Sequence, residues 1–435
     1  MRNETASHRA PIADHPQRYA LANELHARPF PAVEAPCTAA LLAVKQDGSA
    51  EARDRDADRA HLVALLDRAG ADHPPPGATH YYGDIGHARL KWESHTEFVT
   101  YTAFSTATPA RAFDPAQFDV FPRGWLAEAP GERVTSALIR VDFMPDDEDE
   151  IPRLLADWFV PESLAASHVL DGTAIVASDF RIDAAGHMRI AIFVRPGTGS
   201  RRIGRLVQRL CEVETYKTMS MLGLSQARAL GSRMGSLDAR LSELMAGMTS
   251  AEGDSEETLK ALLGIASELE NLLVQSSFRF GATGAYEALV HQRIEVLREE
   301  RFGGRQTMAE FMMRRFDPAM RTVKSAERRL ANMAERANRA GSLLGTRVDV
   351  ERSAQNQELL EGMNRRAELQ LKLQRTVEGL SVVAISYYGV NLASNLVAPP
   401  AAAYGIGQGA VMAMLTPVVV LAVWLLIRRL RSHLQ

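Results

Sequence analysis

The sequence predicts an α+β protein: an α/β N-terminal domain, a long-helix bundle after it, and a C-terminal two-helix transmembrane hairpin. Three patterns along the 435 residues indicate this fold class. Up to about residue 199, short apolar runs alternate with turn residues, which is typical of strands. Between about residues 200 and 378 proline is nearly absent and apolar residues recur every three or four positions, as in amphipathic helices. From Gly379 to Ile427 the chain has no Asp, Glu, Lys or Arg.

These changes of pattern divide the chain into five expected segments. They are a disordered N-terminus (residues 1–10), an α/β cytosolic domain (11–199), a helical domain (200–342), a stalk helix (343–378) and a transmembrane hairpin with a basic cytosolic tail (379–435). The formal net charge of −3 argues against nucleic-acid binding through bulk electrostatics, because such domains usually carry a basic excess. The two cysteines, Cys37 and Cys211, lie far apart, which fits a reducing compartment.

Seven short runs of the N-terminal domain have the composition of strands. They are Cys37 to Val44, Thr79 to Gly83, Ala88 to Trp92, Glu97 to Phe104, Ser136 to Phe143, Thr173 to Ser178 and Met188 to Val194. Asp54 to Ala69 and Ile151 to Phe159 have helical spacing, and Asp183 to Gly186 is expected to form a hairpin turn. No GxGxxG, phosphate-binding glycine loop or nucleophile elbow occurs, which argues against nucleotide or acyl-transfer chemistry.

The helical middle is expected to contain six segments. They are Arg202 to Leu222, Gln226 to Met245, Glu256 to Ser277, Ala285 to Arg301, Met308 to Ala340, and a last one from about Leu343. Glycines 281, 284, 303 and 304 are expected to mark turns. The last helix has Leu359, Met363, Ala367, Leu371 and Gln374 along one face, and the first four form a narrow apolar stripe. We expect a stalk that enters the bilayer and needs neighbours, from its own chain or from other subunits, as in a coiled coil.

The uncharged region is expected to contain two membrane spans. Gly409 to Ile427 is apolar and reaches about 27 Å as a helix, close to the hydrocarbon thickness. Leu380 to Val397 is more polar and is expected to end at Pro399 and Pro400. Basic residues flank the pair but are absent between the spans, so the positive-inside rule puts both ends in the cytoplasm. The alternative is a buried helical hairpin of a soluble core.

Polar side chains alternate along the segment from His87 to Glu97. On one continuous strand they would share a face, and Glu93, His95 and Glu97 could then bind a divalent metal or act as an acid–base pair. Similar chemistry occurs in the NELHARP segment, at Glu24, His26 and Arg28. The alternative is the solvated face of an antiparallel sheet, with carboxylates paired to Arg28 and Arg89, and a hairpin at Glu93-Ser94 would break the common face. Four further polar residues are interpreted as helix neighbours that pair without function: Glu212, Glu214, Tyr216 and Lys217.

Four stretches closely resemble one bacterial family of uncharacterised membrane-anchored proteins, domain of unknown function 3422. They are HPQRYALANELHARPFP, KWESHTEFVTYTAF, CEVETYKTMSMLGL and MNRRAELQLKLQRTVEGLSVVAISYYG, which together span nearly the whole chain. This resemblance brings no established activity with it.

The order of the expected parts also resembles the CorA-type magnesium channels. In that superfamily a Tyr-Gly-Met-Asn motif closes the first span, and its last three residues form a ring at the outer mouth of a pentameric pore. The match here is Tyr388-Gly-Val-Asn391. The resemblance implies that Gly389 and Asn391 meet a hydrated Mg²⁺, with Val390 in place of the methionine. The expected outer loop, Ala398 to Gln408, departs from the pattern because it has no acidic residue.

The leading hypothesis is an oligomeric, non-enzymatic protein of the bacterial inner membrane that transports a divalent cation, Mg²⁺ being the one metal implied. Ser381 and Ser386 are then pore-facing candidates, and the expected partners are the lipid bilayer and further copies of the chain, without nucleic acid. The first rival is a non-transporting scaffold or regulator that uses the hairpin only as an anchor. The second is a membrane-tethered enzyme, which requires Glu24, His26, His95 and Glu97 to converge in a pocket.

Overall fold

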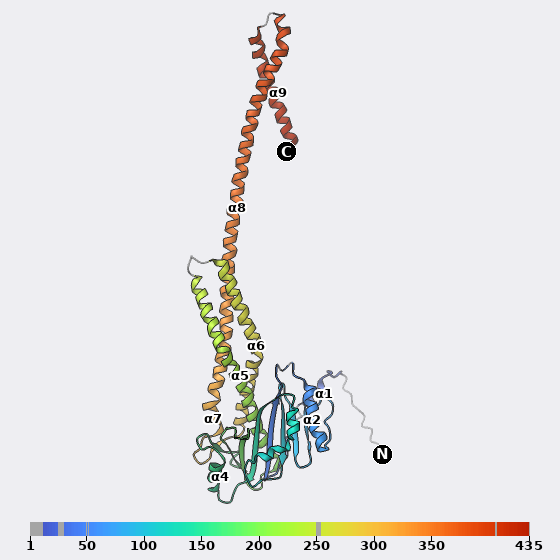
Figure 1. Ribbon diagram of the computed structural model, residues 1–435, viewed down its shortest axis with the longest axis vertical. Helices are drawn as coiled ribbons and strands as arrows, with labels where there is room; N and C mark the ends of the chain where they lie inside the picture. The colour runs from blue at the N-terminus through green and yellow to red at the C-terminus, as the bar shows by residue number, and fades with distance from the viewer. Residues whose placement is uncertain are drawn as a thin grey trace, which may run out of the picture. The chain divides into compact units, whose positions relative to one another are not determined.

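The computed structural model describes residues 12–24, 30–48, 50, 52–248, 254–404 and 407–434. The predicted disordered N-terminus, residues 1–10, lies outside the described residues. Two compact units are distinguished by their internal contacts. One contains residues 1–247 and 262–338, and the other contains residues 248–261 and 339–435. Figure 1 traces the chain from the sheet, in blue and green, to the C-terminal helices in red.

A nine-stranded sheet forms the centre of the first unit, in the order β2-β3-β4-β1-β5-β8-β7-β6-β9. The strands are β1 (Cys37–Lys45), β2 (His80–Asp84), β3 (Arg89–Ser94), β4 (Val99–Ser105), β5 (Glu132–Phe143), β6 (Ala165–Val169), β7 (Ala174–Ser178), β8 (Met188–Val194) and β9 (Glu300–Arg301). All seven predicted strands are present, and β6 and β9 are additions. The predicted α+β fold class is confirmed.

The strand order is symmetric about the central β1–β5 pair. Each half consists of a strand, a helix and three more strands, and in each half the last strand returns to pair with the first. The halves differ in one respect: β1 pairs antiparallel with β4, whereas β5 pairs parallel with β8. The crossover through α4 (Glu150–Trp158) makes this difference, because it returns the chain in the direction of β5.

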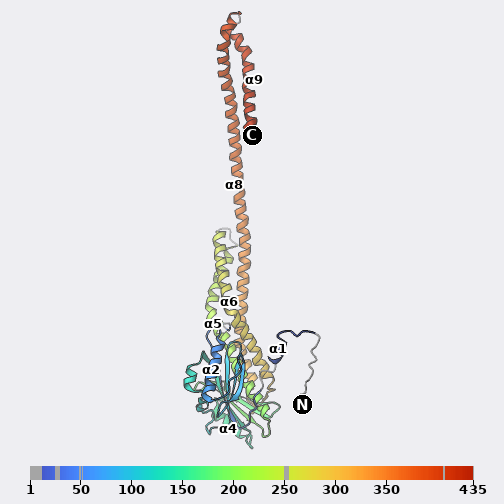
Figure 2. The same ribbon diagram turned by 90° about the vertical axis from the view of Figure 1, so that its right-hand side faces the viewer.

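Both faces of the sheet are covered, since successive side chains of a strand point to opposite sides. On β1, Ala39 and Leu41 belong to a core shared with α5 (Ser200–Gly247), whereas Ala40 and Leu42 pack toward α2 (Arg55–Ala69). The second face is also covered by η1 (Pro115–Val120), α3 (Arg123–Ala127) and α4. Figures 1 and 2 show α2 and α5 on either side of the sheet. A strand buried on both faces needs apolar residues at nearly every position, as in the CTAALLAV run of β1.

The helical middle has fewer breaks than predicted. Its helices are α5, α6 (Ser255–Glu295), α7 (Met308–Arg315) and α8 (Asp317–Ala402). The predicted turn at glycines 281 and 284 is wrong, because α6 continues through both with helical geometry. The predicted turn at Gly303 and Gly304 is correct, and both residues have positive φ, 55° and 72°, which glycine adopts without steric cost. The remaining helices are α1 (Arg18–Glu24) and α9 (Gln408–Leu434).

Helix α7 is fixed to the edge of the sheet by Glu299. Its carboxylate accepts hydrogen bonds from the backbone N–H groups of Met308 (2.9 Å) and Ala309 (2.8 Å), at the start of α7, and from the Ser167 hydroxyl of β6 (2.6 Å). Thr307 and Glu310 complete a capping box at the same end. Only Phe316 separates α7 from α8, so this bond network also holds the base of α8.

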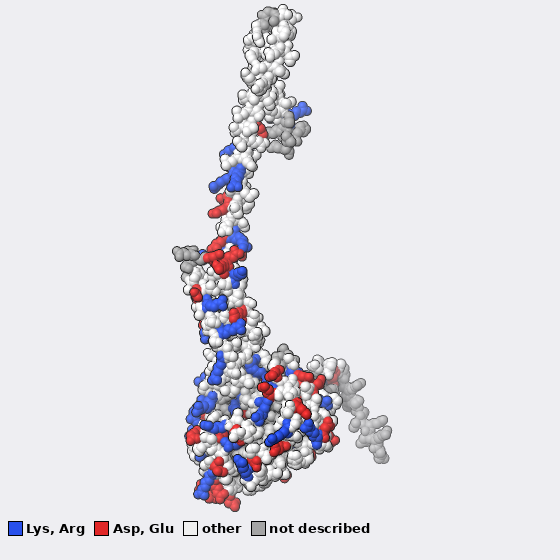
Figure 3. Space-filling view, in the orientation of Figure 1, with Lys and Arg blue, Asp and Glu red and all other residues white. Residues whose placement is uncertain are grey.

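Helix α8 runs for 86 residues without a break, through Pro399 and Pro400 to Ala402. The predicted end of the first span at the two prolines is therefore wrong. From Asp349 to Val377 every residue of α8 is exposed, over a length of about 44 Å. Figure 3 shows mixed blue and red charges on this segment and an uncharged white surface beyond it. Two helices, α8 and α9, are long and apolar enough to cross a membrane.

Candidate functional site

Polar side chains gather on the face of β3 and β4 that α5 covers. Leu90 and Trp92 of β3 point to the α2 side of the sheet, so Lys91 and Glu93 point to α5. Thr100 and Thr102 of β4 face the same side. The predicted alternation of β3 is thus present. Its interpretation as a solvated sheet face is wrong, because a helix more than a hundred residues further along the chain covers it.

Lys91 and Glu93 form an ion pair under α5. Their charged atoms lie 3.0 Å apart, and the two side chains are only 6% and 12% exposed. Removing one partner of a buried pair leaves an uncompensated charge, which costs about 3–5 kcal/mol. This buried pair therefore requires that α5 stays packed over this part of the sheet.

The cluster encloses a cavity of about 20 Å³, the size of one water molecule. Its polar lining includes Lys91, which is held by Glu93, together with Gln208 Oε1 and Thr215 Oγ1, two buried atoms that have no hydrogen-bond partner among the described residues. Burial raises the pKa of the neighbouring Cys211 thiol to about 12, so this thiol is a poor nucleophile at neutral pH. The cavity is too small for an organic substrate.

His95 lies beyond the end of β3, in the turn to β4. Strand β3 ends at Ser94, and the His95 backbone N–H donates to the carbonyl of Phe98 (2.9 Å). The common face expected for His87 to Glu97 therefore does not extend to His95 and Glu97. The His95 ring still lines the 20 Å³ cavity, stacks on Phe98 with centroids 4.3 Å apart, and lies 3.3 Å from Thr100 Oγ1.

Glu97 is bound to the helical layer. Its carboxylate is 1% exposed and accepts two hydrogen bonds from Arg279 of α6, one of them 3.0 Å long. Burial, reinforced by the charge of Glu97, raises the pKa of Tyr286 far above its usual range. This pair ties the β3–β4 turn to α6.

The carboxylates of α5 near the cluster also have basic partners. Glu212 pairs with Arg293, and Glu214 pairs with Lys217 at 2.6 Å and accepts from Thr135 at 2.9 Å. The interpretation of Glu214 and Lys217 as paired helix neighbours is confirmed. Because each of these carboxylates is neutralised by a base, the cluster has the character of a structural network.

The second predicted polar segment contributes little that can be placed. Helix α1 ends at Glu24, whereas His26 and Arg28 lie outside the described residues. In the part of the chain that is described, no group of three or more His, Cys, Asp or Glu side chains is arranged to hold a metal ion.

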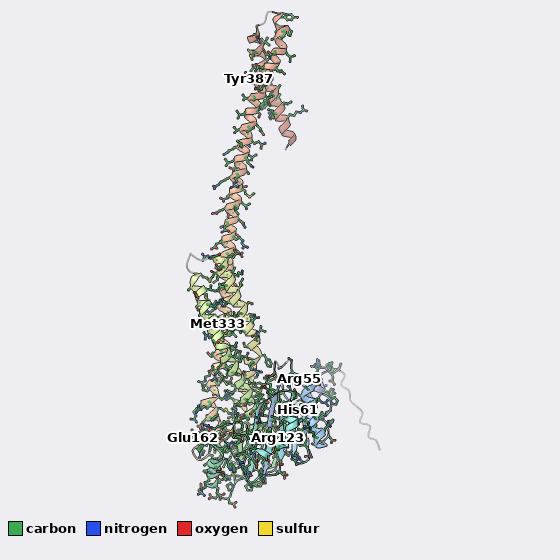
Figure 4. All side chains as sticks on the ribbon, viewed as in Figure 1. Arg55, His61, Arg123, Glu162, Met333 and Tyr387 are labelled. Atoms are coloured by element: carbon green, nitrogen blue, oxygen red, sulfur yellow. The ribbon has the colours of Figure 1, made fainter. Side chains whose placement is uncertain are left out.

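A buried histidine lies on the other face of the sheet. The ring of His61, which is labelled in Figure 4, projects from α2. It stacks on Trp125, with centroids 3.9 Å apart. Its Nε2 is 2.9 Å from the Trp125 carbonyl and its Nδ1 is 3.0 Å from the Tyr101 hydroxyl. A carbonyl can only accept, so Nε2 carries the proton, and a neutral ring accepts at Nδ1 from Tyr101. Burial lowers the pKa of His61.

The motif Tyr388 to Asn391 lies inside α8, which continues to Ala402. Gly389 faces α9: a Cβ at this position would be 3.0 Å from Val419 Cγ1. Val390 is 7% exposed and also packs inward, whereas Tyr388 is 73% exposed. Gly389 thus allows the close approach of α8 and α9, as small residues do between membrane helices, and Val390 packs beside it.

The polar residues of the first span fall on two faces. Ser386 and Ser394 are buried, 5% and 3% exposed, on the side that contacts α9. Ser381, Tyr388 and Asn395 recur every seven residues and lie on the opposite side, because each residue turns an α-helix by about 100°. Of the two predicted pore-facing serines, Ser386 therefore belongs to the helix contact and Ser381 to the outward face.

A groove of about 330 Å³ runs between the two spans. It is lined by apolar side chains of both helices, including Val382, Tyr387 (labelled in Figure 4) and Val420, together with Ser386 and Thr416. The Ser386 hydroxyl has no hydrogen-bond partner among the described residues.

A family model matches residues 13–434 of the chain, described as protein of unknown function (DUF3422). The chain belongs to the DUF3422 family. No curated protein matches it. The match extends over the sheet, the helices that follow it, and both helices that are apolar enough to cross a membrane, so these parts form one family architecture.

In this DUF3422 protein, the side chains that complete the polar cluster were missed in the sequence. Gln208 and Thr215 lie seven residues apart on α5, on the buried face that also carries Cys211 and Glu212. Two polar interruptions at helical spacing in a buried stripe are the signal that could have indicated a buried polar contact.

Proposed function

We propose that this DUF3422 protein is a homo-oligomer of the bacterial inner membrane, with most of its chain in the cytosol, and that it carries divalent cations rather than catalysing a reaction. The observation that carries the proposal is helix α8. One unbroken helix leaves the packed region, is exposed at every position from Asp349 to Val377, and ends in an uncharged span.

The exposed segment of α8 supports oligomerisation. It carries apolar side chains such as Leu359, which is 67% exposed, and Met363. A lone helix in water gains little from such residues, so packing against other copies is the natural way to bury them. The resulting closed bundle would have cyclic symmetry with the α8 helices next to the axis.

The outward face of the first span supports cation passage. It carries Ser381, Tyr388 and Asn395 on the side opposite to α9, and the partly buried Asn391 lies one turn after Tyr388, at the edge of this face. Polar side chains facing lipid are costly, whereas in a bundle they would line a shared path. Amide oxygens suit Mg²⁺, which holds its first water shell tightly, so hydrated Mg²⁺ is the proposed cargo.

Flux of Mg²⁺ into vesicles containing the purified protein tests the proposal. We expect the wild-type protein to conduct, Asn391→Ala to lose nearly all flux, and Ser386→Ala, which alters the α9 contact on the same helix, to retain it. The mass of the detergent-solubilised particle should correspond to several chains. No flux from the wild type, or equal flux from Asn391→Ala, would exclude cation transport.

The alternative is a non-transporting membrane scaffold that uses the hairpin only as an anchor. The contact between Gly389 and Val419 favours it, because the residue implied for ion selectivity contributes to helix packing. A monomeric particle in detergent would support this alternative.

A further inference from the structure

A second cavity, at the base of α5, is rich in arginine. Its volume is about 340 Å³, within the usual size range of small-molecule sites. It lies between α5, the β6–β7 loop and the segment after α6. The charged side chains that line it are Arg202, Arg205, Arg209, Arg298 and Asp171.

The local fold directs these arginines to one place. Arg202, Arg205 and Arg209 follow one another at helical spacing and share a face of α5. The two loops are joined by a hydrogen bond from Leu170 N to Leu297 O (3.0 Å), and Leu297 is fully buried. Leu170, Asp171 and Arg298 all have φ between 51° and 58°, a left-handed conformation that is costly for residues other than glycine. Three residues at the rim of this cavity thus have a strained backbone conformation.

Among the described residues that line the cavity, four arginines face a single acid, Asp171. Asp171 pairs with Arg298 (3.3 Å) and Arg202 (3.7 Å), and Arg202 also donates to the Leu170 carbonyl (2.8 Å). Arg205 and Arg209 form no hydrogen bond or ion pair within the described residues. Glu212, one turn beyond Arg209, is already held by Arg293 and Gln208. Burial, followed by repulsion from Arg205 and Arg293, lowers the pKa of Arg209.

We propose that this cavity binds the phosphoryl groups of an anionic ligand, with Arg205 and Arg209 as the principal contacts. A planar guanidinium donates two parallel hydrogen bonds to a phosphate, and two such groups that lack partners on one helix face provide four. The volume and the four arginines favour a di- or triphosphate over a single phosphate. The proposal is independent of cation transport.

Titration of the purified full-length protein with inorganic pyrophosphate tests the site. We expect saturable binding at one site per chain. Arg205→Gln and Arg209→Gln should each weaken it about tenfold or more, as expected for the loss of a charge-assisted contact. Neither change leaves an orphaned acid, so both variants should keep the wild-type circular dichroism spectrum. Arg205→Lys, which keeps the charge but not the bidentate geometry, should bind with intermediate affinity.

Arg201→Gln is the matched control. Arg201 lies on the same turn of α5, is exposed and does not line the cavity. Its substitution should change the affinity by less than about twofold. Equal weakening by Arg201→Gln and Arg205→Gln, or pyrophosphate binding that does not saturate, would overturn the proposal.

Two lipid compositions distinguish a soluble phosphate compound from a lipid headgroup. The titration is repeated in nanodiscs of phosphatidylcholine with and without phosphatidic acid. Equal pyrophosphate affinity in both assigns the site to a soluble ligand. If phosphatidic acid lowers the pyrophosphate affinity of the wild type but does not change the residual affinity of Arg205→Gln, the site binds a lipid headgroup.

Discussion

At the residue scale, the contacts of His61 on one face of the sheet keep its ring neutral, with the proton on Nε2. Its Nε2 proton is committed to the Trp125 carbonyl, and its Nδ1 is occupied by Tyr101. Protonation would place a second N–H against the Tyr101 hydroxyl inside a core of aromatic rings. The folded protein therefore opposes protonation, in agreement with the lowered pKa.

This histidine makes stability depend on pH. The pKa of His61 is lower in the folded chain than the 6.5 of the free side chain, so the unfolded chain binds the proton first. The contribution is complete above about pH 6.5 and is lost as the pH falls toward the folded pKa. We expect His61→Gln to unfold at a lower urea concentration than wild type at pH 7.5. The difference should narrow toward pH 5, by at most about 1.4 kcal/mol for each pH step of one below 6.5. Tryptophan fluorescence measures both, and parallel pH profiles would contradict the assignment.

At the same scale, the sequence predicted which residues alternate but not what covers them. Lys91 and Glu93 follow a two-residue period that indicates one face of a strand. Whether that face meets water depends on α5, which is distant in sequence. Glu97 likewise finds Arg279 only through the tertiary fold. Partners of this kind cannot be deduced from local spacing. The sequence therefore indicated which residues of β3 are polar, but not that helices α5 and α6 cover and bind them.

At the element scale, the glycines divide according to what they contact. Gly223 of α5 lies where α6 crosses, and a Cβ there would be 2.2 Å from Thr283 Oγ1. A Cβ at Gly231, further along the same helix, would have no atom within 4 Å. The first glycine allows two helices to approach, and the second has no such role.

These two glycines give opposite predictions. Gly223→Ala should lower the free energy of unfolding by about 1–3 kcal/mol, because the methyl group forces α5 and α6 apart. Gly231→Ala should raise it by about 0.5–1 kcal/mol through better helix propensity. Urea unfolding followed by circular dichroism measures both. Equal effects of the two substitutions would show that the helix crossing is not tight.

Element boundaries show where local signals are sufficient. Strand runs such as that of β1 are predicted to within a residue because apolar composition and turn residues agree. The prediction of a turn at glycines 281 and 284 fails because composition does not reveal whether a glycine needs positive φ, as Gly303 does. The predicted helix start at Met308 is correct, and the capping box of Thr307 and Glu310 is the local signal that fixes it.

At the scale of the whole molecule, the two units differ in the interactions that stabilise each of them internally. The hydrophobic clusters on both faces of the sheet are made of residues from the first unit. In the second unit, α8 is exposed along its charged segment, and surface pairs such as Arg352 with Glu256 join it to the start of α6. Exposed pairs contribute little, about 0–1 kcal/mol each.

A chain ended after Val348 should therefore remain folded. We expect the shortened chain to be soluble without detergent and monomeric by mass. Its melting temperature should lie within a few degrees of that of the first unit in the full protein, because no member of either hydrophobic cluster is removed. Thermal unfolding by circular dichroism and light scattering measure these properties. Aggregation or loss of the melting transition would show that the exposed part of α8 stabilises the sheet.

The Glu299 network has a mechanical consequence. Because one carboxylate holds two N–H groups of α7 and a hydroxyl of β6, tension along α8 would pass through α7 into the edge of the sheet. A short strand, β9, lies directly after Glu299 and is the outermost member of that edge. A pull on α8 would thus be shared between two anchors. One is this border of the sheet, and the other is the packing of Met320 and Val323 in the core, with the ion pairs that join α8 to α5 and α6.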